Sequence, residues 1–401
     1  MNRTPRGCSN IGGAAAAKIE FCRNRAMQLF SLYGYRPFSP AGLQLMEDVW
    51  NNLSPARSKR LIALTSPYGE PCVLRGDLTL LAVSYLGSHF TGNERPLRLS
   101  YADRVFSMPQ PPRSNLEENQ VGVEIIGWEG EGADAEVVSL LLRTLDALSI
   151  ESSAVVVGDM AVMWKFFEGL PEELCQRLVT GLQDGRVSDY MEEIASAEMP
   201  EKRRALLRAL PTLKGGMGVL DEAAQMLDNP AALRSLKNLC ATLEKLGYAE
   251  RLRVDLGFVR DLGYYSGPIF NVYSTATGSL LGGGGRYDGL LAKVGLDGEA
   301  AGFALNLKEL ADHSAMGTPT PKIMIWCGAS DPAEGLRYAD VLSRRGVPFE
   351  LSWNADGAES LRVAKLRGYA WWVDYTSKKA FLVETGEQKE LAEMERGTLS
   401  C

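Results

Sequence analysis

The sequence has little that could hold a metal ion. It contains only two histidines, His89 and His313, which lie far apart and have no cysteine or second histidine nearby. Its seven cysteines are scattered, and no two of them form a Cys-x-x-Cys pair. A structural zinc ion needs four such ligands, usually in closely spaced pairs. The sequence therefore argues against a metal site and favours reduced thiols over disulfides. We expect neither a metal nor a cofactor.

An excess of basic residues is also missing. The formal net charge is -7 and the isoelectric point is about 5.3, whereas proteins that grip a long nucleic acid backbone carry a basic surface. No run reaches the roughly 18 apolar residues that a membrane span needs. The N-terminal alanine run is too short, and too soon followed by charge, for a signal peptide. These absences predict a cytoplasmic protein that binds neither a membrane nor tRNA.

The order of the predicted elements indicates a long first domain and a small second one. Apolar residues recur at helical spacing over 14–32, and a second helix is predicted over 78–85. Short strands rich in Val, Ile, Leu and Tyr are predicted over 71–74, 97–101, 122–127 and 154–157. Amphipathic helices then dominate 162–248. Beyond a proline-rich segment near residue 317, strands and helices alternate, which predicts a small α/β unit with a mostly parallel sheet.

The segment LRGDLT at 74–79 places an acidic side chain at the start of the second predicted helix. Asp77 could cap the helix that begins at Leu78, since aspartate is a preferred capping residue. Its carboxylate could equally hold the ammonium group of an amino acid. The two roles are compatible, and both are expectations.

The segment NQVGVEIIG at 119–127 predicts a strand with polar side chains on one face. Because side chains alternate along a strand, Gln120, Gly122 and Glu124 share that face. A glutamate that points into a core is costly unless something pairs with it. Either a ring nitrogen of a ligand or a neighbouring arginine would serve.

Two further segments combine a cation, tyrosines and glycines. VRDLGYYSG at 259–267 offers Arg260 for a carboxylate, and its Tyr264–Tyr265 pair could either bind a ligand or simply pack in a strand. The glycine run in GGGGRYDGL at 282–290 lacks the spacing of a phosphate-binding P-loop. We expect it to let the backbone lie close beneath a ligand.

Together these segments resemble the histidine pocket of the histidyl-tRNA synthetases. The resemblance implies an α+β fold, with a class II synthetase-like antiparallel sheet core in residues 1–317 and a helical insertion at about 162–248. It implies that residues 318–401 form a small C-terminal α/β domain, similar to a shortened anticodon-binding domain. It also implies that one group of residues binds histidine: Asp77, Thr79, Gln120, Glu124, Arg260, Tyr264 and Tyr265.

The residues that such a synthetase uses to hold ATP do not match. The position after Phe106, where the family carries an arginine, is Ser107; the acid expected two residues later is Pro109; and the motif 3 arginine of the family falls on Glu309. Adenylate formation depends on such cationic clamps, so we expect the ATP site to be lost and the chain not to be an enzyme.

In this combination the chain resembles the synthetase-like regulatory subunits of ATP phosphoribosyltransferase, which act in histidine biosynthesis. That resemblance implies a short-form catalytic subunit as partner, L-histidine as effector and a self-dimer within a hetero-octamer. An active histidyl-tRNA synthetase and a stand-alone histidine-sensing module are the alternatives.

Overall fold

The structure, a computed structural model, describes residues 4–50, 58–89, 96–109, 115–227, 230–260, 265–316, 323–328 and 332–398. The chain divides into two compact units, Met1–Met316 and Gly317–Cys401. Within the described ranges, no helix is both long and apolar enough to cross a membrane.

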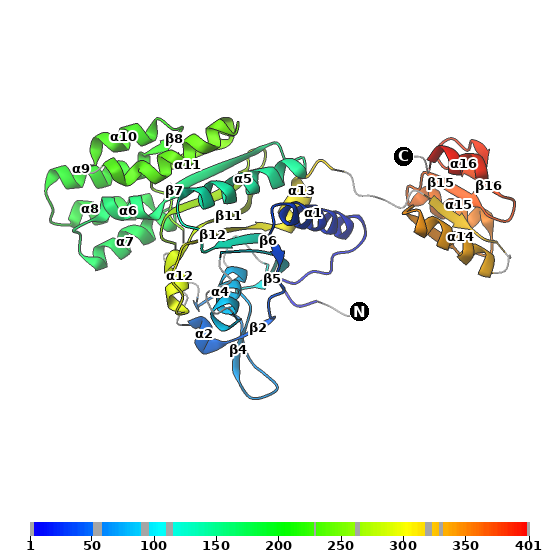
Figure 1. The fold of residues 1–401 in the computed structure, drawn as a ribbon, viewed down its shortest axis with the longest axis horizontal. Coiled ribbons are helices and arrows are strands. Elements are labelled where there is room, and N and C mark those ends of the chain that lie inside the picture. The colour runs from blue at the N-terminus through cyan, green and yellow to red at the C-terminus, as the bar shows by residue number, and fades with distance from the viewer. Residues whose placement is uncertain are drawn as a thin grey trace. The chain divides into compact units, whose positions relative to one another are not determined.

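A nine-stranded sheet forms the centre of the first unit (Figure 1). Its neighbouring strands are antiparallel, except that β1 pairs with β5 and β7 with β9 in parallel. Across the sheet the strands follow the order β1 (Arg36–Pro37), β5 (Leu97–Phe106), β6 (Glu117–Ile126), β12 (Ala300–Asn306), β11 (Leu280–Arg286), β10 (Pro268–Ser274), β7 (Ser153–Asp159), β9 (Leu252–Asp255) and β8 (Lys214–Gly215). The predicted antiparallel core is confirmed.

Helices cover both faces of this sheet. Helices α1 (Gly13–Leu32), α5 (Glu131–Ala147) and α13 (Leu307–His313) lie on one face, and α4 (Leu78–His89) and α12 (Asp288–Lys293) lie on the other (Figure 1). Helix α1 buries Cys22, Ala26 and Phe30, which recur every four residues and so form one stripe. The helix predicted over 14–32 is confirmed.

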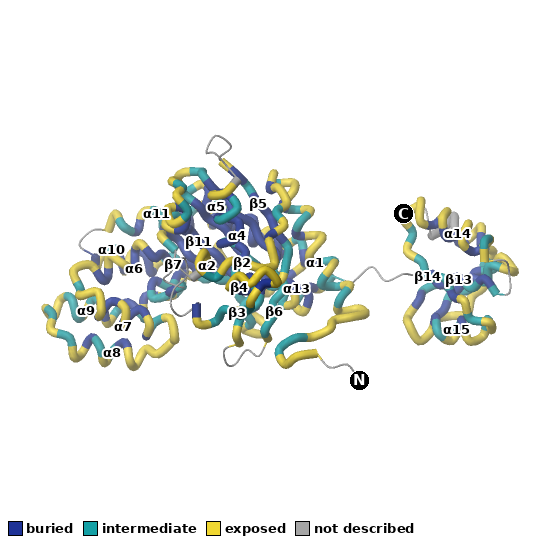
Figure 2. The backbone as a smooth tube through the Cα atoms, turned by 90° about the horizontal axis from the view of Figure 1, so that it is seen from below, coloured by how far each residue is buried: buried dark blue, intermediate teal, exposed yellow. Residues whose placement is uncertain are grey.

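The stretch predicted as a helical insertion is mostly helical, and its outer surfaces are exposed (Figure 2). Its helices are α6 (Met160–Phe167), α7 (Glu172–Gln183), α8 (Val187–Ser196), α9 (Glu201–Ala209), α10 (Val219–Met226) and α11 (Arg234–Lys245). Helix α11 buries Leu236, Leu239, Cys240 and Leu243, the spacing of one helix face. The short strand β8 pairs with β9 and thereby joins this stretch to the main sheet, which the sequence pattern did not predict.

A second, three-stranded sheet lies beside helix α4 in the first unit. It consists of β2 (Leu43–Leu45), β4 (Pro71–Leu74) and β3 (Ala63–Thr65), and α2 (Met46–Trp50) follows β2. Arg75, directly after β4, donates from Nη1 to the Pro40 carbonyl oxygen at 2.9 Å and from Nε to the Arg104 carbonyl oxygen at 2.6 Å. The bond to Arg104 fastens the end of β4 to β5, and the bond to Pro40 fastens it to the segment before β2. Together they fix the direction in which the chain enters α4.

The second unit contains a five-stranded sheet in the order β14 (Phe349–Ser352), β13 (Ile323–Trp326), β15 (Trp371–Asp374), β16 (Lys379–Leu382) and β17 (Gln388–Glu390). Its helices are α14 (Pro332–Arg344), α15 (Gly357–Leu366) and α16 (Leu391–Thr398). The predicted parallel pairing holds for β13 with β14 and β15, but β15–β16 and β16–β17 are antiparallel. The turn between Asp374 and Lys379 is too short for the crossover that a parallel pair needs.

Candidate functional site

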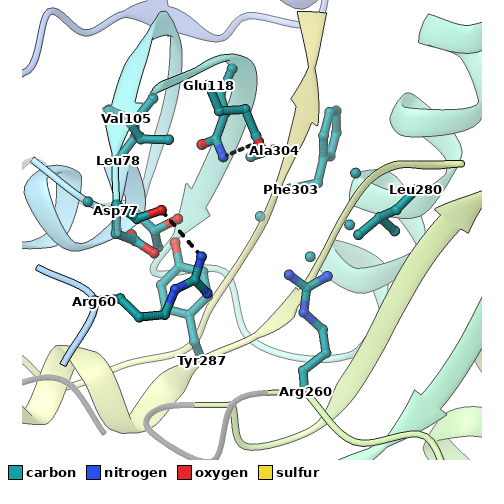
Figure 3. A pocket seen from close by; sticks show the side chains of 18 of the residues that line it. Arg60, Asp77, Leu78, Val105, Glu118, Arg260, Leu280, Tyr287, Phe303 and Ala304 are labelled. Atoms are coloured by element: carbon teal, nitrogen blue, oxygen red, sulfur yellow. Dashed lines mark hydrogen bonds between the residues drawn. The ribbon is translucent and has the colours of Figure 1, made fainter. Parts of the chain in front are cut away.

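Segments from widely separated parts of the first unit line one cavity of about 310 Å³ (Figure 3). Five of the predicted histidine-binding residues lie in its wall: Asp77, Thr79, Gln120, Arg260 and Tyr265. Tyr264, also predicted, lies outside the described residues. Glu124 lies behind the wall rather than in it. A cavity of this size is at the lower end of the roughly 300–1,000 Å³ common for small-molecule sites.

Asp77 sits at the junction between β4 and α4. The backbone N–H of Leu80 donates to Asp77 Oδ1 at 2.8 Å, which is the capping role expected for an aspartate just before a helix. The same side chain lines the cavity. Capping fixes the carboxylate at the cavity wall, so the predicted contact with a ligand ammonium is compatible with it.

Glu124 is fully buried, and the structure gives it partners that sequence reasoning did not consider. Thr79 Oγ1 and Tyr101 Oη donate to its Oε1 at 2.6 and 2.9 Å, and Tyr287 Oη donates to its Oε2 at 2.6 Å. The expected partner was a ligand nitrogen or an arginine. Three hydroxyl groups from separate elements take that place, so the carboxyl group is already hydrogen-bonded by the protein itself.

Burial is the main influence on the ionisation of this carboxyl group. It raises the pKa of Glu124 to about 8, against the opposing effect of the three hydroxyl donors. Two of those donors, Thr79 and Tyr287, line the cavity. Glu124 therefore acts on the cavity indirectly, because it fixes the direction of two hydroxyl groups in the wall.

Arg260 is held against strand β10. Its Nη1 donates to the Phe270 carbonyl oxygen at 3.0 Å and to Asn271 Oδ1 at 2.5 Å, and its guanidinium lies 5.3 Å from the centre of the Tyr265 ring. Gly283 faces Asn271 in the register of β10 and β11. A Cβ atom there would overlap Arg260 Nη1. The glycine run was expected to lie close beneath a ligand. Gly282, Gly283 and Gly284 line the cavity, and Gly283 also makes room for the guanidinium of Arg260.

We expect Asn271→Ala to weaken the binding of an amino acid in the cavity by roughly 5- to 10-fold, because Arg260 loses the side-chain acceptor that orients it. Calorimetric titration with L-histidine measures this. Asn238→Ala is the matched control, since Asn238 makes its side-chain hydrogen bond to Glu131 elsewhere. Equal affinities for the wild type and Asn271→Ala would contradict the role given to Arg260.

Arg60 and Tyr287 are among the cavity residues to which sequence reasoning assigned no role. Arg60 lines the cavity, and its Nη2 donates to Ser107 Oγ at 3.3 Å across 47 residues of sequence. No local pattern around Arg60 indicated a site. Tyr287 belongs to the segment GGGGRYDGL that carried the resemblance, but no binding role was predicted for it.

The three positions predicted to have lost ATP contacts are not grouped together. Ser107 lines the cavity, whereas Pro109 and Glu309 do not occur among its described lining residues. Pro109 is exposed in the segment after β5, and Glu309 Oε2 lies 4.0 Å from His313 Nδ1 on α13.

The chain is similar in sequence to one family of known proteins. The histidyl-tRNA synthetase family profile matches residues 7–310. The ATP phosphoribosyltransferase regulatory subunit of Syntrophotalea carbinolica is 30% identical over 315 residues, which cover 76% of this chain and 73% of that protein. The subunit of the same name from Rubrobacter xylanophilus is 30% identical over 399 residues, which cover 96% of this chain and 94% of that protein.

A solved structure has the same fold. It is an ATP phosphoribosyltransferase regulatory subunit/histidyl-tRNA synthetase from Bacillus halodurans, with a TM-score of 0.82 and 24% identity, and the match covers 90% of this chain and 96% of that one. The matches in sequence and fold both extend over most of the first unit and its cavity. The chain therefore belongs to the histidyl-tRNA synthetase-like family of ATP phosphoribosyltransferase regulatory subunits.

Proposed function

We propose that this chain binds the short-form catalytic subunit of ATP phosphoribosyltransferase, activates it, and conveys feedback by L-histidine in the first step of histidine biosynthesis. The names of its relatives support the regulatory role. The convergence of Asp77, Thr79, Gln120, Arg260 and Tyr265 on one cavity is the observation that carries the histidine-binding part.

The cavity offers a partner for each polar group of histidine. Asp77 can accept from the ammonium group, and Arg260 can donate to the carboxylate. Around the imidazole, the hydroxyl groups of Thr79 and Tyr287, which donate to Glu124, can accept from a ring N–H. The hydroxyl group of Tyr265 can donate or accept. In this arrangement Glu124 orients two of these hydroxyl groups instead of touching the ligand.

A regulatory role does not require catalysis by this chain. We propose that ATP is not activated here, because none of the positions at which the resemblance places the ATP contacts carries a cation: they are Ser107, Pro109 and Glu309, and of these only Ser107 lines the cavity. A ligand can act without a reaction when it binds one state of an assembly better than another. The chain would then need no cofactor and no tRNA.

The assembly itself is part of the proposal. We infer a self-dimer of this chain within a hetero-octamer that contains the catalytic subunits. Residues 1–317 would supply the synthetase-like core and the cavity, and residues 318–401 would form a shortened anticodon-binding-like domain without an RNA ligand. The two compact units of the chain support this division.

Histidine should inhibit the complex of this chain with the catalytic subunit more strongly than it inhibits the catalytic subunit alone. Linkage makes the coupling between the two ligands reciprocal. Saturating phosphoribosyl pyrophosphate should weaken histidine binding to the complex by the factor by which histidine weakens the binding of that substrate, typically 5- to 150-fold. The measurements are ATP phosphoribosyltransferase activity with and without this chain, and calorimetry of histidine with and without that substrate.

Three outcomes separate the alternatives. An activity that does not change when this chain is added would overturn the regulatory proposal. If this chain activates the catalytic subunit but phosphoribosyl pyrophosphate leaves the histidine affinity of the complex unchanged, the chain is an activator without feedback through this cavity. Histidine-dependent exchange of pyrophosphate into ATP by the purified chain alone would instead identify an active synthetase.

A further inference from the structure

Among the residues that the structure describes, two arginines from unrelated segments line the cavity. Arg60 precedes β3, and Arg260 follows β9. Figure 3 shows the two side chains extending from different walls, with Arg60 on the side of Asp77. A guanidinium is a strong donor for carboxylate and phosphate oxygens, so the cavity has cationic groups in two places.

Arg60 is fixed at both its main chain and its side chain. Its carbonyl oxygen accepts from the backbone N–H of Met108 at 2.7 Å, and its Nη2 donates to Ser107 Oγ at 3.3 Å. Both contacts are with the two residues that directly follow β5. A guanidinium that is already oriented loses less conformational freedom when it binds an anion.

Ser107 is the position at which the resemblance places an arginine. The structure brings the guanidinium of Arg60 to that position from a different part of the chain. The resemblance implies a lost cation at 107, but the folded chain has a cation beside it. The cavity wall there is therefore able to bind an anion.

The charges in the cavity favour one kind of anion. Among the described lining residues, two arginines are matched by two carboxylates, Asp77 and Glu118. Gln120 Nε2 donates to Glu118 Oε1 at 2.9 Å, which holds the second carboxylate at the wall. A polyanion would be repelled by both carboxylates. A zwitterion instead offers a positive group to a carboxylate and a negative group to an arginine. The balance favours an amino acid.

We propose that Arg60 and Arg260 together form the carboxylate-binding part of the cavity, and that Arg60 makes the cavity select ligands that carry an oxyanion. The identity of the ligand rests on the proposed function; the anion-binding role of Arg60 rests on the cavity itself. Ser107 positions Arg60 by accepting its hydrogen bond.

Calorimetry of the full-length chain tests this with three probes: L-histidine, histamine, which lacks the carboxylate, and inorganic pyrophosphate. Arg60→Gln should lower histidine affinity by about 10- to 100-fold, the loss expected for a hydrogen bond to a charged group, and should change histamine affinity by less than about threefold. Ser107→Ala keeps both charges and should lower histidine affinity by roughly two- to fivefold. Lys59→Gln removes an exposed neighbouring charge outside the cavity wall and is the matched control.

Each outcome decides a different point. If Arg60→Gln binds histidine as the wild type does, the inference about Arg60 is wrong while histidine binding stands. If Arg60→Gln loses histidine and histamine equally, Arg60 supports the cavity structurally and does not select an anion. If the wild type binds no histidine, the histidine part of the proposed function fails. The anion-binding role of Arg60 then stands if the wild type binds pyrophosphate and Arg60→Gln does not. That role fails as well if the wild type binds no pyrophosphate.

Discussion

Replacing Gly302 with alanine is expected to destabilise the protein by about 3 kcal/mol or more. Gly302 faces Glu124 in the register of β6 and β12, and a Cβ atom there would overlap both Glu124 Oε2 and the carbonyl oxygen of Val123. Overpacking of this kind typically costs about 1–3 kcal/mol. A displaced Glu124 would also leave buried hydroxyl groups without their acceptor, at about 1–3 kcal/mol for each unsatisfied group.

Denaturant unfolding measures this loss, with Gly289→Ala as the control. A Cβ atom at Gly289 would have nothing within 4 Å, so this variant should retain the wild-type stability within about 0.5 kcal/mol. A Gly302→Ala protein as stable as Gly289→Ala would show that β6 and β12 can move apart without cost, and would contradict the close packing around Glu124.

The effect of Glu124→Gln on the free energy of unfolding is expected to change from neutral or destabilising to stabilising as the pH rises. Burial raises the pKa of Glu124 to about 8 from 4.5, so between these values the folded state binds more protons than the unfolded state. The stability that Glu124 contributes is therefore complete below about pH 4.5 and is lost as the pH rises towards 8. Glutamine does not titrate and loses nothing over this range. The difference between the two proteins should change by on the order of 3–5 kcal/mol, since each unit of pKa shift corresponds to about 1.4 kcal/mol.

Urea unfolding of both proteins at several pH values from 5 to 9 provides the test. The variant should be equal to the wild type or less stable at pH 5, and more stable at pH 9. Asp134 and Asp159, whose pKa values are raised to about 6 mainly by burial, give the same pH dependence to both proteins and cancel in the difference. Parallel curves would mean that Glu124 is already ionised at pH 5 in the folded protein.

Much of the first unit follows from local patterns. The helix over 14–32 and the strand over 71–74 were predicted within a residue of their observed bounds, because hydrophobic periodicity and Gly or Pro breaks act over a few residues. The capping role of Asp77 is also local, since the acceptor and the Leu80 N–H are three residues apart. The segments that resemble a histidine pocket could be identified for the same reason: each motif is contiguous.

The surroundings of Glu124 could not be predicted in this way. Its hydroxyl donors come from α4, β5 and the residue before α12, at separations of 45, 23 and 163 residues. A pattern within one strand shows that a buried carboxyl group needs partners, but not which of many distant hydroxyl groups will reach it.

The sequence by itself determined the class of fold, the family and five of the residues that line the cavity, because contiguous motifs carry the resemblance that implies all of them. Only the tertiary structure decided that Arg60 stands beside Ser107, that Gly283 makes room for Arg260, and that Glu124 lies behind the cavity wall. Each of these depends on the space between elements that are distant in the sequence. That space is set when strands pair and side chains close-pack against one another, and no local pattern of residues encodes it.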